Sequence, residues 1–150
     1  MTLDIMPLKP LVVEGWAHKP FSESDDFTDE WWSETLYGDD PGQRFFAFFD
    51  GQHEVARAEV EIQAELEAEY GRPSHPGPYA VINFFEVSSD HRLRGHGAEA
   101  VRLLAAVFEQ PLVAYSVGAD AFWGALGWDK HRSAGESSED RSMFVGASDN

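Results

Sequence analysis

The sequence contains no cysteine. This absence excludes disulfide bonds, thiolate metal sites and cysteine nucleophiles. No apolar run approaches the roughly 20 residues that a helix needs to cross a bilayer. The first residues lack a basic stretch followed by an apolar one, so no secretory signal is predicted. We therefore expect a protein of the reducing cytoplasm with no membrane partner.

Basic residues are scarce, with 11 Lys and Arg against 27 Asp and Glu, and the formal net charge is −16. That charge argues against nucleic acid as a partner, because binding it gains free energy from phosphate neutralisation by Lys and Arg. A cationic small molecule or a basic peptide remains compatible, although acidity that only aids solubility is the interpretation we favour. The six histidines show no closely paired spacing, so no metal site is predicted.

What the chain does contain is enough apolar material for a core. Hydrophobic residues make up 43% of its 150 residues and aromatic residues 13%. This length and composition suit one folded domain, residues 1–150, around one hydrophobic core.

The first half predicts mostly strands. Residues 3–14 contain two prolines and form an edge strand at best. Thr28 can cap a helix that runs to about Tyr37. Residues 43–62 predict a hairpin around the Asp50-Gly51 turn. The alternative for the second arm is a helix through residues 58–70, whose residue types are good helix formers.

The second half alternates strands and helices. Residues 79–87 are nearly all apolar, which is typical of a central strand covered on both faces. An amphipathic helix follows, with apolar side chains at helical spacing. The pattern then predicts a strand over 111–117, a short helix over 118–128 and a last strand within 141–146. This order requires at least one parallel crossover, hence an α/β or α+β sheet.

A basic, glycine-containing turn lies between the buried strand and the amphipathic helix. Residues 91–97 read HRLRGHG. A helix start presents backbone N–H groups without partners, and glycines let an anion approach the backbone. Arg92 and Arg94 add bidentate phosphate contacts. The combination favours a diphosphate-binding site, and the alternative is a glycine-containing loop with solvated arginines.

At this turn the sequence resembles the GNAT superfamily of acyl-CoA-dependent N-acetyltransferases. Residues 92–97 match its Q/R-x-x-G-x-G/A motif, and Val87 stands where family members often carry a Val that closes the preceding strand. Residues 122–128 (FWGALGW) are similar to the family phrase F-Y-x-x-L-G-F. The resemblance covers residues 79–130, and the hairpin at 43–62 is similar to the two preceding strands.

The resemblance implies a fold, a cosubstrate and a place to bind it. The fold would be α/β (α+β), a mixed and mostly antiparallel sheet with central parallel strands 4 and 5 and flanking helices. The cosubstrate would be acetyl-CoA or another acyl-CoA. Main-chain groups of the strand end would hold the pantetheine arm, and those of the turn would hold the pyrophosphate. The residues concerned are Phe85, Val87, Arg92, Leu93, Arg94, Gly95, His96, Gly97 and Ala98.

The catalytic residues are less clearly indicated, because Trp123 stands where many relatives carry a Tyr general acid. An indole N–H donates a hydrogen bond but gives up no proton at ordinary pH. Tyr115 and Ser116 are the nearest replacements by sequence, with Tyr115 as a core aromatic the alternative. For the base, Asn83 could orient a water and Glu86 could titrate. The alternative for Glu86 is an ion pair with one of the arginines of the turn.

The acidic segment 22–40 is the best candidate for acceptor recognition. Glu30, Trp31 and Trp32 could line an acidic, aromatic mouth for a cation, and the alternative is a solvated helix with its tryptophans packed on the core. The resulting hypothesis is transfer of an acetyl group to a primary amine of an unidentified acceptor. The alternative is a catalytically silent GNAT-fold module that binds acyl-CoA. Monomer and homodimer are both open.

Overall fold

The computed structural model describes residues 2–33, 35–37, 42–64, 78–89, 95–116, 119–131 and 142–146. By their contacts they form two compact units. The first comprises Met1–Val60 and Phe84–Leu104, and the second Glu61–Asn83 and Ala105–Asn150. The strands of the large sheet follow the order β1-β5-β6-β7-β8-β10-β9. The prediction of a single domain over residues 1–150 stays a prediction.

The first unit is built on four strands of this sheet. β1 (Asp4–Leu8) pairs antiparallel with β5 (Gln43–Asp50). β5 turns into β6 (His53–Ala64) through Gly51, which has a φ of +63°. β7 (Tyr79–Val87) lies beside β6. The predicted hairpin is confirmed, and strand structure continues to Ala64, so the helical alternative is wrong for the described part of that arm.

A second, three-stranded sheet belongs to the same unit. Its strands are β2 (Leu11–Val13), β3 (Trp16–His18) and β4 (Thr35–Tyr37), paired antiparallel in that order. The edge strand expected over residues 3–14 is therefore two strands in two sheets. β1 takes the edge of the large sheet, where a strand proline is tolerated.

The helix predicted from Thr28 to about Tyr37 is shorter than expected. α1 spans only Asp29–Trp32, and the chain then extends into β4. The backbone of β4 pairs with β3 instead of continuing the helix. The expected stop at Gly38 lies outside the described residues.

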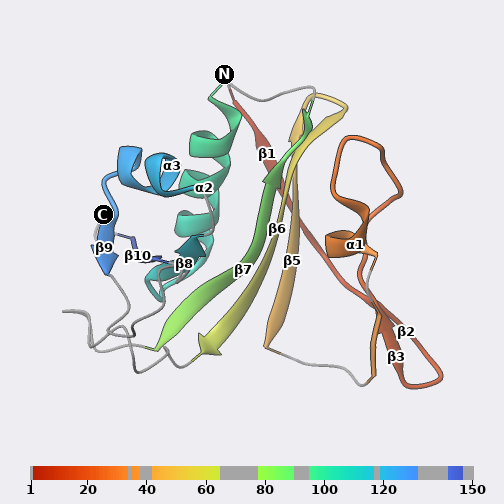
Figure 1. Cartoon of the computed structure of the whole chain (residues 1–150). Helices are drawn as coiled ribbons and strands as arrows, with labels where there is room; N and C mark the ends of the chain where they lie inside the picture. The colour runs from red at the N-terminus through yellow and green to blue at the C-terminus, as the bar shows by residue number, and fades with distance from the viewer. Residues whose placement is uncertain are drawn as a thin grey trace. The chain divides into compact units, whose positions relative to one another are not determined.

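α2 (His96–Val107) follows the glycine turn, as predicted. Its buried stripe includes Ala100, Val101 and Leu104, which accounts for its amphipathic pattern. In Figure 1, α1 and α2 lie on opposite sides of the β5–β6–β7 part of the sheet. This placement agrees with the alternation of side chains along β7, since Phe84 and Glu86 contact the α1 region.

The second unit carries the parallel crossover pair. β8 (Leu112–Ser116) runs parallel to β7, with Ala80 opposite Leu112. β10 (Ser142–Val145) pairs antiparallel with β8 and with β9 (Asp129–His131). The predicted mixed, mostly antiparallel sheet with a central parallel pair is confirmed, and the predicted strands 4 and 5 are β7 and β8. β9 was not predicted.

The core of this unit forms where β7, β8 and β10 meet. Tyr79, Val81, Val113, Met143 and Val145 make one buried cluster. α3 (Asp120–Ala125) follows β8, and Gly127, with a φ of +81°, ends the helical region as expected. The four-residue buried start of β7, Tyr79 to Ile82, matches the prediction of a strand covered on both faces.

Two glycines provide a matched test of backbone strain. A Cβ added at Gly51 or at Gly124 would meet no atom within 4 Å, but only Gly51 has a positive φ. We expect Gly51→Ala to lower the free energy of unfolding by about 1 kcal/mol, since the left-handed region disfavours a Cβ. Gly124→Ala, inside α3, should raise it by about 0.5–1 kcal/mol. Urea titration of both variants measures the difference, and effects of equal sign would contradict this account.

Candidate functional site

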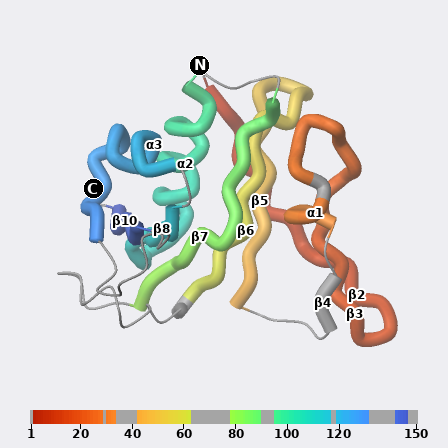
Figure 2. Tube along the Cα trace, viewed as in Figure 1, coloured from red at the N-terminus to blue at the C-terminus, as the bar shows by residue number. Residues whose placement is uncertain are grey.

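The predicted coenzyme turn ends in a glycine that starts α2. Gly95 has a φ of +81°, and the Glu99 N–H donates to the Gly95 carbonyl over 3.2 Å. The amides of His96, Gly97 and Ala98 therefore precede the first helical i→i−4 bond. Figure 2 shows that β7 ends and α2 begins at the same end of the sheet. Of the predicted coenzyme contacts in the turn, Arg92, Leu93 and Arg94 lie outside the described residues.

The side chain of His96 fixes the start of this helix. It is buried, and its Nε2 lies 3.6 Å from Oδ2 of Asp50 at the end of β5. The imidazole of His96 is therefore directed toward the end of β5. Sequence reasoning named His96 only for its main chain, and the contact with Asp50 was not predicted.

The end of β7 alternates as predicted. Phe85 and Val87 are half-buried, while Glu86 is 7% exposed and turned to the other face. The Ser88 N–H donates to the Val55 carbonyl over 2.8 Å, so β7 stays attached to β6 beyond its last residue. The predicted pantetheine-binding stretch is thus a firmly held strand end.

Glu86 joins β7 to the α1 region through three short hydrogen bonds. Its carboxylate accepts the Thr28 N–H at 2.8 Å, the Thr28 hydroxyl at 2.7 Å and the Trp32 indole N–H at 2.8 Å. These three donors are neutral, and the arginine partners weighed from the sequence, Arg92 and Arg94, lie outside the described residues. A buried carboxylate needs such donors, and hydrogen bonds to a charged group stabilise more than neutral ones. The geometry thus gives Glu86 a positioning role.

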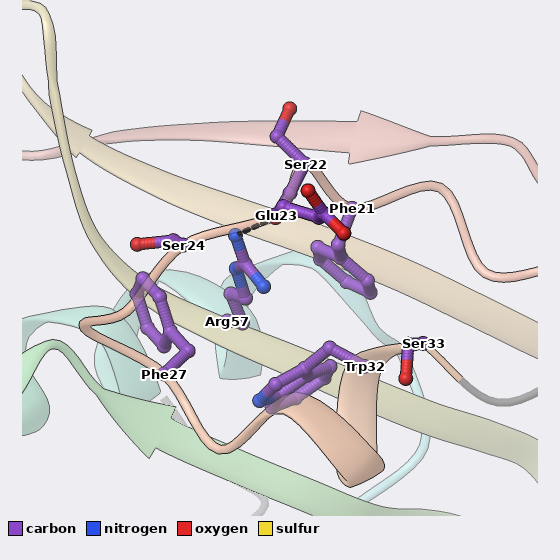
Figure 3. A pocket seen from close by; sticks show the side chains of 8 residues that line it. All are labelled: Phe21, Ser22, Glu23, Ser24, Phe27, Trp32, Ser33 and Arg57. Atoms are coloured by element: carbon purple, nitrogen blue, oxygen red, sulfur yellow. Dashed lines mark hydrogen bonds between the residues drawn. The ribbon is translucent and has the colours of Figure 1, made fainter.

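Two further buried ionic contacts lie where β6 meets residues Lys19–Trp32, here named the Lys19–Trp32 segment. Lys19 Nζ lies 2.6 Å from Glu59 Oε1 and donates to the Trp31 carbonyl at 2.9 Å. Arg57 of β6 donates from Nε and Nη2 to the two oxygens of Glu54, and from Nη2 to the Ser22 carbonyl (Figure 3). None of these contacts was predicted, because Arg57 and Glu59 alternate with small apolar residues as solvent-facing charges do.

The predicted acceptor residues divide between surface and interior. Trp31 is 38% exposed and lies over Phe84, with ring centroids 5.5 Å apart, and Glu30 is exposed. Trp32 is only 2% exposed and packs edge-on against Phe21 and Phe84. The packed alternative therefore describes Trp32, while Trp31 and Glu30 are accessible.

The remaining catalytic candidates belong to the second unit. Asn83 of β7 is exposed, and Tyr115 of β8 is half-buried against the apolar cluster. The Ser116 hydroxyl is occupied, because it accepts the Ala119 N–H at 3.1 Å and hydrogen-bonds the Asp120 carboxylate. Trp123, at the usual Tyr position, is 5% exposed and packs against Phe122 and Trp128.

Within the part of the chain that the structure describes, no three His, Asp or Glu side chains gather as a metal site. No helix in the described ranges has the length and hydropathy that a membrane span requires.

The Glu86 contacts predict a large loss of stability on truncation. Glu86→Ala leaves the Trp32 indole N–H and the Thr28 amide buried without their acceptor. We expect the free energy of unfolding to fall by about 3 kcal/mol. The control Glu109→Ala removes an exposed carboxylate and should change it by less than about 0.5 kcal/mol. Urea titration measures the free energy of unfolding of both variants. Equal losses in the two would show that the hydrogen bonds of Glu86 do not stabilise the fold.

The Asp120 contacts predict a pH-dependent contribution to stability. The hydrogen bond from Lys130 lowers the pKa of Asp120 below its ordinary value of 3.8, and the Ser116 hydroxyl adds to this effect. A lowered carboxyl pKa stabilises the fold above the ordinary value and loses that contribution as the pH falls through the lowered one. Wild type should therefore exceed Asp120→Asn in stability at neutral pH, with the gap closing below about pH 4. Thermal melts from pH 7 to pH 3 measure this gap, and a gap that widens in acid would refute it.

No family model matches the sequence, and no curated protein matches it either. Among solved structures, an acetyltransferase from Thermus thermophilus aligns with a TM-score of 0.55 and 26% identity over 71% of this chain. The alignment covers 64% of that protein, so the chain spans less than two thirds of its length.

Two more distant structures show the same fold. Tetrahymena GCN5 aligns at 12% identity with a TM-score of 0.52, covering 74% of this chain and 72% of its own. The second is the Y144F form of the toxin AtaT, bound to acetyl-CoA and to the C-terminus of the antitoxin AtaR. It aligns at 15% identity with a TM-score of 0.51, and the alignment covers 69% of this chain and 68% of AtaT. The chain therefore has the fold of the GNAT acetyltransferases.

Proposed function

We propose that this chain is an N-acetyltransferase that moves an acetyl group from acetyl-CoA to a primary amine. The observation that carries the proposal is the passage from a central strand, through Gly95, into the start of α2, in a chain with the GNAT fold. The structural neighbours are acetyltransferases, and the AtaT structure contains acetyl-CoA. The cytoplasmic location and the choice between monomer and homodimer stay as predicted from the sequence.

The start of α2 supports the binding of the coenzyme pyrophosphate. Three consecutive amides, from His96 to Ala98, precede the first helical hydrogen bond, and the positive end of the helix dipole lies there. We assign the pyrophosphate to these amides and to the main chain and arginines of residues 92–95. The main chain from Phe85 to Val87 would pair with the pantetheine arm.

Acetyl-CoA would supply the activated acyl group, as a thioester. The acceptor nitrogen forms a bond to the carbonyl carbon, the carbon–sulfur bond breaks, and the proton lost by nitrogen ends on sulfur. An N–H near Val87 would stabilise the oxyanion. Tyr115 is our proposed acid, because it is one of the two hydroxyl residues of β8 that stand nearest in sequence to the usual acid position, and it is half-buried.

We assign the role of general base to a water molecule. Asn83 is exposed and could orient that water, and positioning alone can supply much of the rate. Glu86, whose carboxylate accepts three hydrogen bonds, would support the site by holding Thr28 and Trp32 in place. The exposed Trp31 and Glu30 would meet the acceptor, for which a cation is the favoured charge class.

One observation favours the second candidate function, a silent acyl-CoA-binding module. Trp123 replaces the usual acid and is buried against Trp128 and Phe122, where it can serve packing alone. Release of free CoA in the presence of a panel of primary amines distinguishes the two. Turnover supports the enzyme, whereas tight acetyl-CoA binding without turnover on any amine supports the module.

The amide of Ala98 gives a direct test of the pyrophosphate assignment. Ala98→Pro removes this N–H without breaking a helical hydrogen bond, because proline is tolerated in the first helical turn. One charge-assisted hydrogen bond is lost, so we expect acetyl-CoA affinity to fall about 10- to 100-fold. The control Ala98→Ser keeps the amide and should bind like wild type. Titration calorimetry measures both, and equal affinities would contradict the assignment.

A further inference from the structure

The large apolar side chains that the protein exposes are concentrated in residues 6–16. Of the seven such side chains in the described ranges, five lie in this stretch, namely Met6, Leu11, Val12, Val13 and Trp16. Four of the five belong to the β2–β3 hairpin, which Figure 1 shows at the lower right margin of the first unit. Exposed apolar residues that gather in one place indicate an interaction surface.

β2 is exposed on both of its faces. The register sets Val13 opposite Trp16, and Leu11 lies two residues before Val13, so these three side chains share one face. Leu11 is 64% exposed, Val13 46% and Trp16 47%. Val12 points to the other face, beside its cross-strand partner Ala17, and is still 46% exposed. An apolar strand that water reaches from both sides lacks the packing that a hairpin needs for stability.

The outer edge of β2 also offers backbone hydrogen-bonding groups. β2 is the terminal strand of its sheet, and within the described ranges only β3 pairs with it. Glu14 and Gly15 have φ angles of +51° and +86°, as the two residues of a type I′ hairpin turn do. Val13, next to that turn, belongs to a hydrogen-bonded pair, and such pairs alternate with non-hydrogen-bonded ones along the ladder. The N–H and C=O of Val12 therefore face away from β3, toward the outer edge.

The charges beside β2 indicate what pairs with this edge. β2 itself is uncharged, and the exposed residues Lys9 and Glu14 stand before and after it. In the described part of the chain, no ion pair engages either of them. A strand with a cation near one end and an anion at the other is complementary to an antiparallel copy of itself, because each end then meets the opposite charge. A parallel copy would bring like charges together.

We propose that this edge joins two copies of the chain, with β2 antiparallel to β2 about a two-fold axis at Val12. The two Val12 residues exchange two N–H···O=C bonds, as the members of a hydrogen-bonded pair do. Leu11 then lies opposite the second copy's Val13, so the exposed apolar faces join. Lys9 comes within one ladder position of the second copy's Glu14. The two three-stranded sheets become one continuous sheet across the two copies.

The net charge of −16 weakens this association without preventing it. Charges more than about 8 Å apart are largely screened at physiological ionic strength, and the strands that meet carry uncharged side chains. A contact made through one short strand is small, so the dimer should be a weak one, with a Kd of about 10–100 μM.

The first experiment measures molecular mass by sedimentation equilibrium, at protein concentrations from a tenth of the expected Kd to ten times that value. Wild type should pass from monomer to dimer. Val12→Pro removes the outward N–H without breaking a bond to β3, since proline is tolerated at such edge positions. It should raise the Kd about 10-fold or more, the value of two hydrogen bonds. The control Val107→Glu, at an exposed valine of α2, should dimerise like wild type. A wild type that stays monomeric throughout, or a dimer that Val12→Pro leaves unchanged, overturns the proposal.

The second experiment reverses the charges on either side of β2. Lys9→Glu and Glu14→Lys each bring like charges together and should raise the Kd about 3- to 10-fold. The double variant restores opposite charges and should dimerise like wild type, which a contact elsewhere on the surface would not produce. A double variant no tighter than the single ones refutes the antiparallel pairing. Both experiments omit coenzyme, so their outcome is independent of the proposed acetyltransferase function.

Discussion

The arrangement of the first unit depends on one buried carboxylate. Glu86 stands in an apolar strand, where a charge without partners would be expensive, and the Thr28 and Trp32 donors meet that need. These bonds attach both ends of α1 to β7. Lys19 with Glu59 and Arg57 with Glu54 repeat this solution along the neighbouring strand. Polar contacts, and not a long helix, attach the Lys19–Trp32 segment to the sheet.

A chain of net charge −16 is a poor partner for an anion unless the local field is reversed. In the proposed site the start of α2 would provide that reversal, because amides and a helix dipole act over a few ångströms while the distant acids are screened. The imidazole of His96 is directed toward Asp50, and the proposed contact is the helix backbone, which carries no net charge.

In the second unit, a tryptophan stands at the position where many GNAT relatives carry a catalytic tyrosine. Trp123 keeps the aromatic place of the family phrase but packs with Trp128 and Phe122. Ser116, a second hydroxyl near the end of β8, is engaged by the start of α3. Tyr115 of β8 is the hydroxyl that we propose for proton transfer.

Local patterns in the sequence determined much of the fold. The Asp50-Gly51 turn, the apolar run of β7 and the apolar spacing of α2 depend on neighbours in the chain, so they were predictable. So was the glycine that precedes α2, in the turn where the sequence resembles the GNAT superfamily. Tertiary structure alone decided that Arg57 and Glu59 are buried, that Trp32 bonds Glu86 and that Thr28 donates to a strand 58 residues away. A charged side chain can be buried only when a partner from a distant part of the chain packs against it. A local sequence pattern does not indicate which residue that partner is.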